Sequence, residues 1–98
     1  MSPLQKRIDL MNELGITIPD EMFDFLLVMV GGAKKHGPNN WLNPDGAKSS
    51  HVDMHASIFR HVAQSSAGVT VDEDSGLHPL LHAACRCLMH YTRLERGL

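Results

Sequence analysis

The chain has 98 residues, enough for one small domain, and we treat residues 1–98 as a single unit. Its 43% hydrophobic and 20% charged residues are typical of a folded globular protein and exclude a disordered chain. A net charge of −2 leaves no basic excess to hold duplex nucleic acid, and no apolar run is long enough for a membrane span. No signal-peptide core follows the start, and Cys85 and Cys87 would point apart on one helix. A reduced, cytoplasmic protein is therefore expected.

The first two predicted helices follow from capping residues and apolar spacing. Ser2 is placed as the N-cap of the first helix, Pro3 takes its first position, and Gly15 ends it. The second helix opens at Pro19 and ends near two lysines. Its residues from Met22 to Val30 are apolar on nearly every side, so we expect it to be central or packed on both sides.

Two more helices complete an all-α fold of about four helices. The third is expected to begin after Ser50 as its cap and to end before Gly68, and the fourth to run from about Pro79 to Glu95. Helical spacing predicts which positions face the core. On the third helix these are Val52, His55 or Ala56, Phe59, Val62 and Ala63; on the fourth they are Leu80, Leu81, Ala84, Leu88 and Tyr91.

One long loop rich in Gly, Pro and Asn separates the second and third helices, over residues 36–50, with a strong turn signal at residues 43–46. A loop of this length in a small domain is usually functional or disordered. Trp41, the only tryptophan, follows Asn40. An indole can stack on a base and an amide can pair with a base edge. Trp41 could equally anchor the loop to the core, and both interpretations stand.

An acidic turn leads into the fourth helix. The stretch reads Asp72-Glu73-Asp74-Ser75-Gly76-Leu77-His78-Pro79-Leu80-Leu81-His82. If the helix begins near His78, then His78 and His82 share a face beside a helix N-terminus, which suits a phosphate, a carboxylate or a metal. The alternative is structural: Asp74 and Ser75 cap the helix, and both imidazoles only make ordinary hydrogen bonds within the fold.

The third helix adds further candidate side chains. Arg60 and His61 fall largely off its apolar stripe, and a guanidinium can bind phosphate in a bidentate manner, although an isolated surface arginine is commoner. His51 and His55 form another i, i+4 pair. With no acid beside them other than Asp53, a metal there is not favoured.

Three separated strings now carry a resemblance to a known family. They are Gly32-Ala33-Lys34-Lys35-His36-Gly37 followed by Asn40-Trp41, then Arg60-His61, then Asp72-x-Asp74-Ser75-Gly76-x-His78 with His82-Ala83-Ala84. In order and spacing the chain resembles, from about Phe23 to Leu98, the N-terminal domain of the phage dATP/dGTP diphosphohydrolases. That group is related to the MazG-like all-α nucleotide pyrophosphohydrolases. The resemblance implies phage ancestry, an α-helical oligomer and a purine-nucleotide ligand.

The chain departs from the family pattern at its acids. Val69 follows Gly68 where a Glu is common, and Asp74 stands where a Glu is also common. MazG-like catalysis holds Mg²⁺ with Glu-x-x-Glu and Glu-x-x-Asp pairs. Here the only such pair is Glu21 with Asp24, and no Glu-x-x-Glu is present. Asp72 and Asp74 could still supply carboxylates, but from a turn. These departures weaken the case for hydrolysis and leave nucleotide binding intact.

Three hypotheses of function follow. The first is a protein that sequesters a purine nucleotide or a cyclic dinucleotide signal without a cofactor, as an anti-defence protein in the cytoplasm of an infected bacterium. The second is a dATP/dGTP diphosphohydrolase that uses Mg²⁺ or Mn²⁺ at Asp72 and Asp74. The third is a small structural or interaction protein. The predicted nucleotide-binding residues are Lys34, Lys35, Asn40, Trp41, Arg60, His61, His78 and His82.

A homo-oligomer is expected because three partner helices in so small a domain are too few to cover an apolar second helix. Ligand sites at or near subunit contacts would let two copies supply cations and imidazoles. The alternative is a monomer in which the Trp41 loop folds back over the second helix.

Overall fold

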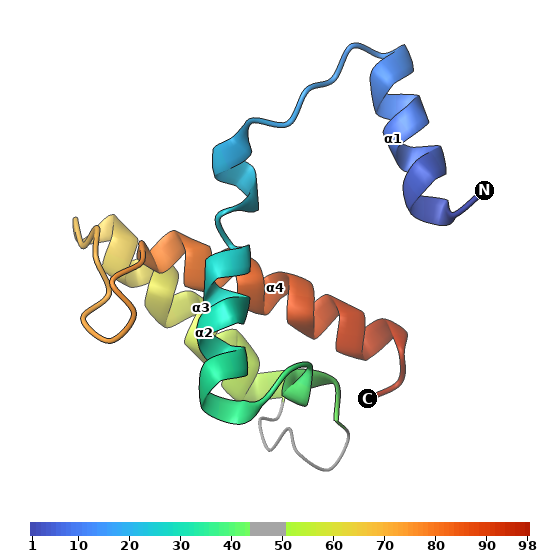
Figure 1. Cartoon of the computed structure of the whole chain (residues 1–98). Helices are drawn as coiled ribbons and strands as arrows, with labels where there is room; N and C mark the ends of the chain where they lie inside the picture. Colours follow the sequence, from blue (N-terminus) through green and yellow to red (C-terminus); the bar gives the residue numbers. More distant parts are fainter. Residues whose placement is uncertain (44–50) are drawn as a thin grey trace.

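The structure is a computed structural model in which residues 1–43 and 51–98 are described. Four α-helices and two short 3-10 turns follow each other along these residues, with no strand, so the all-α prediction is confirmed (Figure 1). Apart from Asn43, the turn predicted at residues 43–46 and the cap predicted at Ser50 lie outside the described residues. The elements are α1 (Pro3–Glu13), η1 (Asp20–Phe23), α2 (Leu26–His36), η2 (Asn40–Leu42), α3 (His51–Ser66) and α4 (Pro79–Glu95).

The body of the molecule is an antiparallel pair of helices, α3 and α4, with α2 lying across it (Figure 1). Ring contacts fix the direction of the pair, because His51 meets His90 at 4.9 Å while His61 meets His82 at 5.0 Å. Apart from Met54, the buried side chains are small or are imidazoles, as expected where two helices approach closely. They are Met54 and His61 on α3, and Pro79, Ala83, Cys85 and His90 on α4. Both cysteines are free, as predicted.

The predicted core faces of α3 and α4 are wrong for this single chain. Phe59 is 70% exposed and Tyr91 is 62% exposed, whereas the polar His61 is 5% exposed. The two helices turn small and imidazole side chains toward each other, and no third layer of this chain covers the large apolar ones. We call these outward residues the α3/α4 apolar face. Its members are Val52, Phe59 and Val62 on α3, and Leu80, Leu88, Tyr91 and Leu94 on α4.

Helix α1 begins and ends as predicted. The Ser2 side chain accepts a hydrogen bond from the Gln5 backbone N–H at 3.1 Å, with Pro3 at the first helical position. Gly15 follows the helix with φ of +69°, the left-handed conformation that glycine adopts freely. No residue of α1 is buried, and an extended connector holds the helix away from the body (Figure 1).

The second helix does not begin at Pro19 as predicted. Pro19 precedes the 3-10 turn η1, and regular α-helix starts only at Leu26. No residue of η1 or α2 is buried, so little packing is available to hold the acidic first turn in the α conformation. The expectation that this helix is central is also wrong within one chain, where Leu27 and Val30 are each 50% exposed. The two lysines do lie in its last turn, where cations are favourable.

We expect Gly31→Ala to stabilise the chain by about 0.5–1 kcal/mol. Gly31 lies inside α2, and a Cβ placed there would meet nothing within 4 Å. Alanine lowers the conformational entropy lost on folding and is the better helix former. Urea unfolding of the two proteins measures the difference. An unchanged or lower midpoint would show that something outside the described chain, such as a second copy, packs against the backbone of Gly31 where a Cβ would interfere.

The chain is more open than a closed monomer. Its Cα radius of gyration is 15.2 Å, against about 13 Å expected for a compact chain of this length. It exposes 7316 Å², about a third more than a folded monomer of 10.8 kDa usually does. Both α1 and the α3/α4 apolar face contribute to this excess. None of the helices in the described part could span a membrane.

Candidate functional site

The N-terminus of α4 is capped by a histidine. Pro79 occupies the first helical position, as predicted, and the Nδ1 atom of His78 accepts a hydrogen bond from the Leu80 backbone N–H at 3.0 Å. His78 has extended backbone angles and lies outside the helix. The helix therefore begins next to His78, as predicted, and its cap is neither Asp74 nor Ser75.

The acidic turn before α4 is closed around one carboxylate. Asp72 Oδ1 accepts the backbone N–H groups of Asp74 and Ser75, each at 3.0 Å, and the Ser75 hydroxyl at 3.2 Å. Backbone bonds from Asp72 to Leu77 and from Gly76 to Asp72, both 2.8 Å, complete the turn. The Ser75 N–H is the main reason why the pKa of Asp72 lies below its ordinary value. The turn thus presents an ionised carboxylate in a fixed position.

The turn is joined to the two long helices through imidazoles. Ser75 Oγ lies 2.7 Å from Nε2 of His82 on α4. The His82 ring stacks on the His61 ring of α3, with centroids 5.0 Å apart and 21° between the planes. His61 Nδ1 in turn lies 3.1 Å from the side-chain oxygen of Gln64. Asp72, Ser75, His82 and His61 therefore form one continuous polar chain across three segments.

Two cations lie close enough to His82 to act on its pKa. Burial lowers that pKa most, followed by His61, while Arg86 and Lys35 lower it further and Asp72 opposes them. Lys35 comes from the last turn of α2 and Arg86 from α4. The Nε atom of Arg86 is buried and, within the described residues, has no hydrogen-bond partner. We call the group Lys35, His61, His82 and Arg86 the cation cluster.

Sequence reasoning missed Arg86. Its signal was available, because residues four apart on a helix lie on the same side and Arg86 follows His82 by four. Of the predicted nucleotide-binding residues, the structure brings together Lys35, His61 and His82. Lys34 is exposed in the same turn of α2 as Lys35. Arg60 is exposed, and its guanidinium donates to Ser57 Oγ of its own helix at 3.5 Å.

Asn40 and Trp41 belong to the η2 turn, and a hydrogen bond to Trp41 joins this turn to α4. The Trp41 carbonyl accepts a hydrogen bond from the Arg93 guanidinium. Arg93 follows His82 by eleven residues, a separation of about 16 Å along the helix. The indole Nε1 atom is buried, and no partner for it occurs in the described part of the chain. Trp41 is thus attached through its backbone to the C-terminal end of α4, away from the cation cluster.

The acids predicted to hold a metal lie together in the turn. One oxygen of Asp72 already accepts three hydrogen bonds, while Asp74 is exposed. Over residues 1–43 and 51–98, no three His, Cys, Asp or Glu side chains are grouped to hold a metal ion. A metal at Asp72 and Asp74 therefore stays a prediction, and it would need further oxygen ligands from water, phosphate or another copy of the chain.

We expect the free energy of unfolding to fall as the pH drops below about 6.5. The pKa values of His82 and His90 both lie below the ordinary 6.5, chiefly because of burial. The unfolded chain then binds protons that the folded chain resists, so stability is full above pH 6.5 and declines below it. Thermal melts at pH 8, 6.5 and 5 test this. Equal melting temperatures at pH 8 and pH 5 would contradict it.

Fold and cluster together define a small all-α domain with a polar group of imidazole, guanidinium and ammonium side chains beside an acidic turn. The chain belongs to the family of dATP/dGTP diphosphohydrolase N-terminal domains, which it matches over residues 5–97. This match confirms the resemblance seen in the three sequence strings, and it places the chain in a nucleotide-related family. No curated protein and no solved structure matches the chain.

Proposed function

We propose that the chain binds a purine nucleotide, with the phosphates at the cation cluster. The observation that carries this proposal is the buried Nε of Arg86, a donor with no partner in the described residues, beside His82. A buried guanidinium donor without an acceptor is costly, and a phosphate oxygen would satisfy it. Lys35 adds a second permanent charge, and His61 and His82 can donate to an anion when protonated.

Sequestration fits the chain better than hydrolysis. Of the Glu-x-x-Asp pair, Glu21 lies in η1 and Asp24 directly follows it; both are exposed, and neither belongs to the α3/α4 pair. Asp72 already has one oxygen committed to its own turn. We therefore propose a phage-type protein that withholds a nucleotide, such as a cyclic dinucleotide immune signal, in the cytoplasm of an infected bacterium.

Isothermal titration against dATP, dGTP and a purine cyclic dinucleotide tests the proposal. We expect saturable binding of at least one of them without added metal, and unchanged nucleotide when the protein is denatured and the solution is chromatographed. If none of these nucleotides binds or shifts the melting temperature, the proposal fails, and a structural or interaction protein becomes the better interpretation.

A second candidate function is metal-dependent hydrolysis of dATP or dGTP to the monophosphate and pyrophosphate. The 2.7 Å contact between Ser75 Oγ and His82 Nε2 favours it, because an imidazole linked through a hydroxyl to a fixed carboxylate can serve as a general acid or base. Asp72 and Asp74 would hold Mg²⁺ or Mn²⁺ against the phosphates. Incubation with dATP or dGTP and either metal decides the matter. Turnover that Asp72→Asn abolishes would establish the enzyme.

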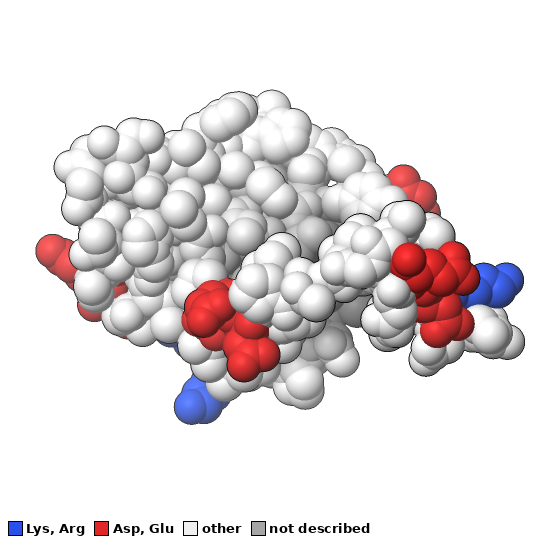
Figure 2. All heavy atoms as spheres, turned by 90° about the horizontal axis from the view of Figure 1, so that it is seen from above, with Lys and Arg blue, Asp and Glu red and all other residues white. Residues whose placement is uncertain are grey.

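We also propose a homo-oligomer in which copies pack through the α3/α4 apolar face. The face has no Lys, Arg, Asp or Glu among its members, and a pair of helices with one bare apolar side is half of a four-helix bundle. Seen from above, the molecule presents a broad expanse without visible charged side chains, which gather at its margins (Figure 2). Two copies that pack against each other through this same face would form a closed, symmetric pair.

A further inference from the structure

Three imidazoles meet at the end of the α3/α4 pair that lies away from the cation cluster. His51 Nδ1 and His90 Nε2 are 3.3 Å apart. The His90 ring lies 4.9 Å from the His51 ring and 5.0 Å from the His55 ring, edge to face in both cases. His90 is only 7% exposed. We call these three residues the imidazole cluster.

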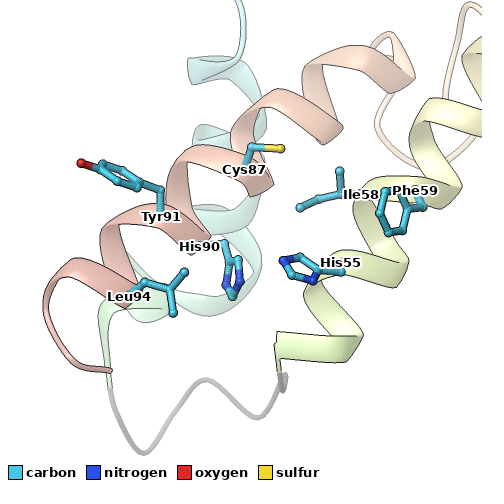
Figure 3. Close-up of a pocket in the computed structure, with 7 residues that line it drawn as sticks. All are labelled: His55, Ile58, Phe59, Cys87, His90, Tyr91 and Leu94. Carbon is cyan, nitrogen blue, oxygen red and sulfur yellow. The ribbon is translucent and has the colours of Figure 1, made fainter.

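Two members of the imidazole cluster, His55 and His90, line a hollow that adjoins the α3/α4 apolar face. Figure 3 shows His55 of α3 and His90 of α4 turned toward each other across this hollow, with Phe59 and Leu94 beside them. The other residues that line it are Ile58, Cys87 and Tyr91. Since Phe59, Tyr91 and Leu94 belong to the proposed contact between copies, a second copy would cover the hollow and remove water from the imidazoles.

Protonation of His90, the buried member of the cluster, is opposed by its surroundings. Burial lowers the pKa of His90 most, and His51, His55 of α3 and Arg93 of α4 lower it further. No carboxylate lines the hollow, and Asp53, the acidic residue in the first turn of α3, is not among the groups that shift this pKa. On the side of the η2 turn, the Trp41 carbonyl accepts a hydrogen bond from Arg93. Within residues 1–43 and 51–98, no carboxylate is among the groups that line the hollow or that shift the pKa of His90.

We propose that the imidazole cluster makes self-association depend on pH: neutral imidazoles allow copies to pack, and protonated ones separate them. This inference rests on the proposed contact through the α3/α4 apolar face. The physical reason is that the second copy buries the cluster further. In the assembled state, a protonated imidazole would lose its hydration and would be repelled by the neighbouring cations. The separated chain takes up protons more readily, and acid therefore shifts the equilibrium toward it.

The test is sedimentation equilibrium of the full chain at pH 8 and pH 5.5, with circular dichroism at each pH. We expect assembly at pH 8 and a dissociation constant about tenfold or more higher at pH 5.5, the change that one pKa unit produces, with helix content retained. Equal dissociation constants at the two pH values would overturn the proposal, as would loss of helix at pH 5.5. A single-chain mass at both pH values would instead show that the underlying assembly proposal is wrong.

Two variants assign the effect to the imidazole cluster. His90→Leu places an apolar side chain at the buried position. The double variant His51→Gln, His55→Gln removes the other two imidazoles and keeps His90. We expect both to assemble at pH 8 and each to lose part of the pH dependence, with the larger loss in His90→Leu because burial acts most on His90. The matched control is His36→Gln, at an exposed histidine in the last turn of α2, which should keep the full effect. Undiminished pH dependence in both cluster variants would overturn the proposal.

Discussion

Arg86→Met is expected to weaken the binding of a purine nucleotide by roughly 30-fold. Methionine keeps the apolar stem of the side chain but removes the guanidinium whose buried Nε has no partner in the described structure. A hydrogen bond to a charged group contributes about 2 kcal/mol, which corresponds to this change in Kd. Isothermal titration at fixed salt measures it.

Arg96→Met is the matched control for this prediction. Arg96 lies just after α4, is exposed, and loses the same single charge on substitution. We expect less than a threefold change, because an exposed charge outside the cluster acts only through solvent and salt. Equal losses in the two variants would mean that the nucleotide responds to net charge, and the site would then lie elsewhere.

Tyr91→Asp is expected to convert an assembled protein to a single chain of 10.8 kDa. Tyr91 is 62% exposed on the α3/α4 apolar face, so the substitution removes little from the core of one chain. Between two copies it would place a carboxylate in an apolar contact with no cation to pair it, which costs several kcal/mol. Light scattering at micromolar concentration, with circular dichroism to confirm helix content, gives the result.

Val71→Asp serves as the control for Tyr91→Asp. Val71 is 58% exposed in the segment before the acidic turn, outside the α3/α4 apolar face. The same aspartate there should leave the mass unchanged. If the Tyr91 variant keeps the mass of the unmodified protein, copies do not meet through this face. If the unmodified protein is already a single chain, the whole assembly proposal is wrong.

Several features that depend on a few neighbouring residues were predicted from the sequence, although the helix start at Pro19 was not among them. The Ser2 cap, the Gly15 end and the start of α4 at Pro79 all agree with the structure. Each rests on bonds or steric limits that span three or four residues, so local sequence suffices. The family assignment also came from short strings, and the match over residues 5–97 confirms it.

The sequence by itself therefore determined an all-α chain, the helix ends with strong capping residues, and the family. Only the tertiary structure decided which faces of α3 and α4 meet and which polar groups gather. Periodicity finds an apolar stripe such as Phe59 with Val62, but it does not say whether the same chain or another covers it. The pairing of His61 with His82, and of His51 with His90, depends on the register of two helices, which no local spacing contains. Small side chains and imidazoles let these helices approach closely, and that contact placed the large apolar residues outside.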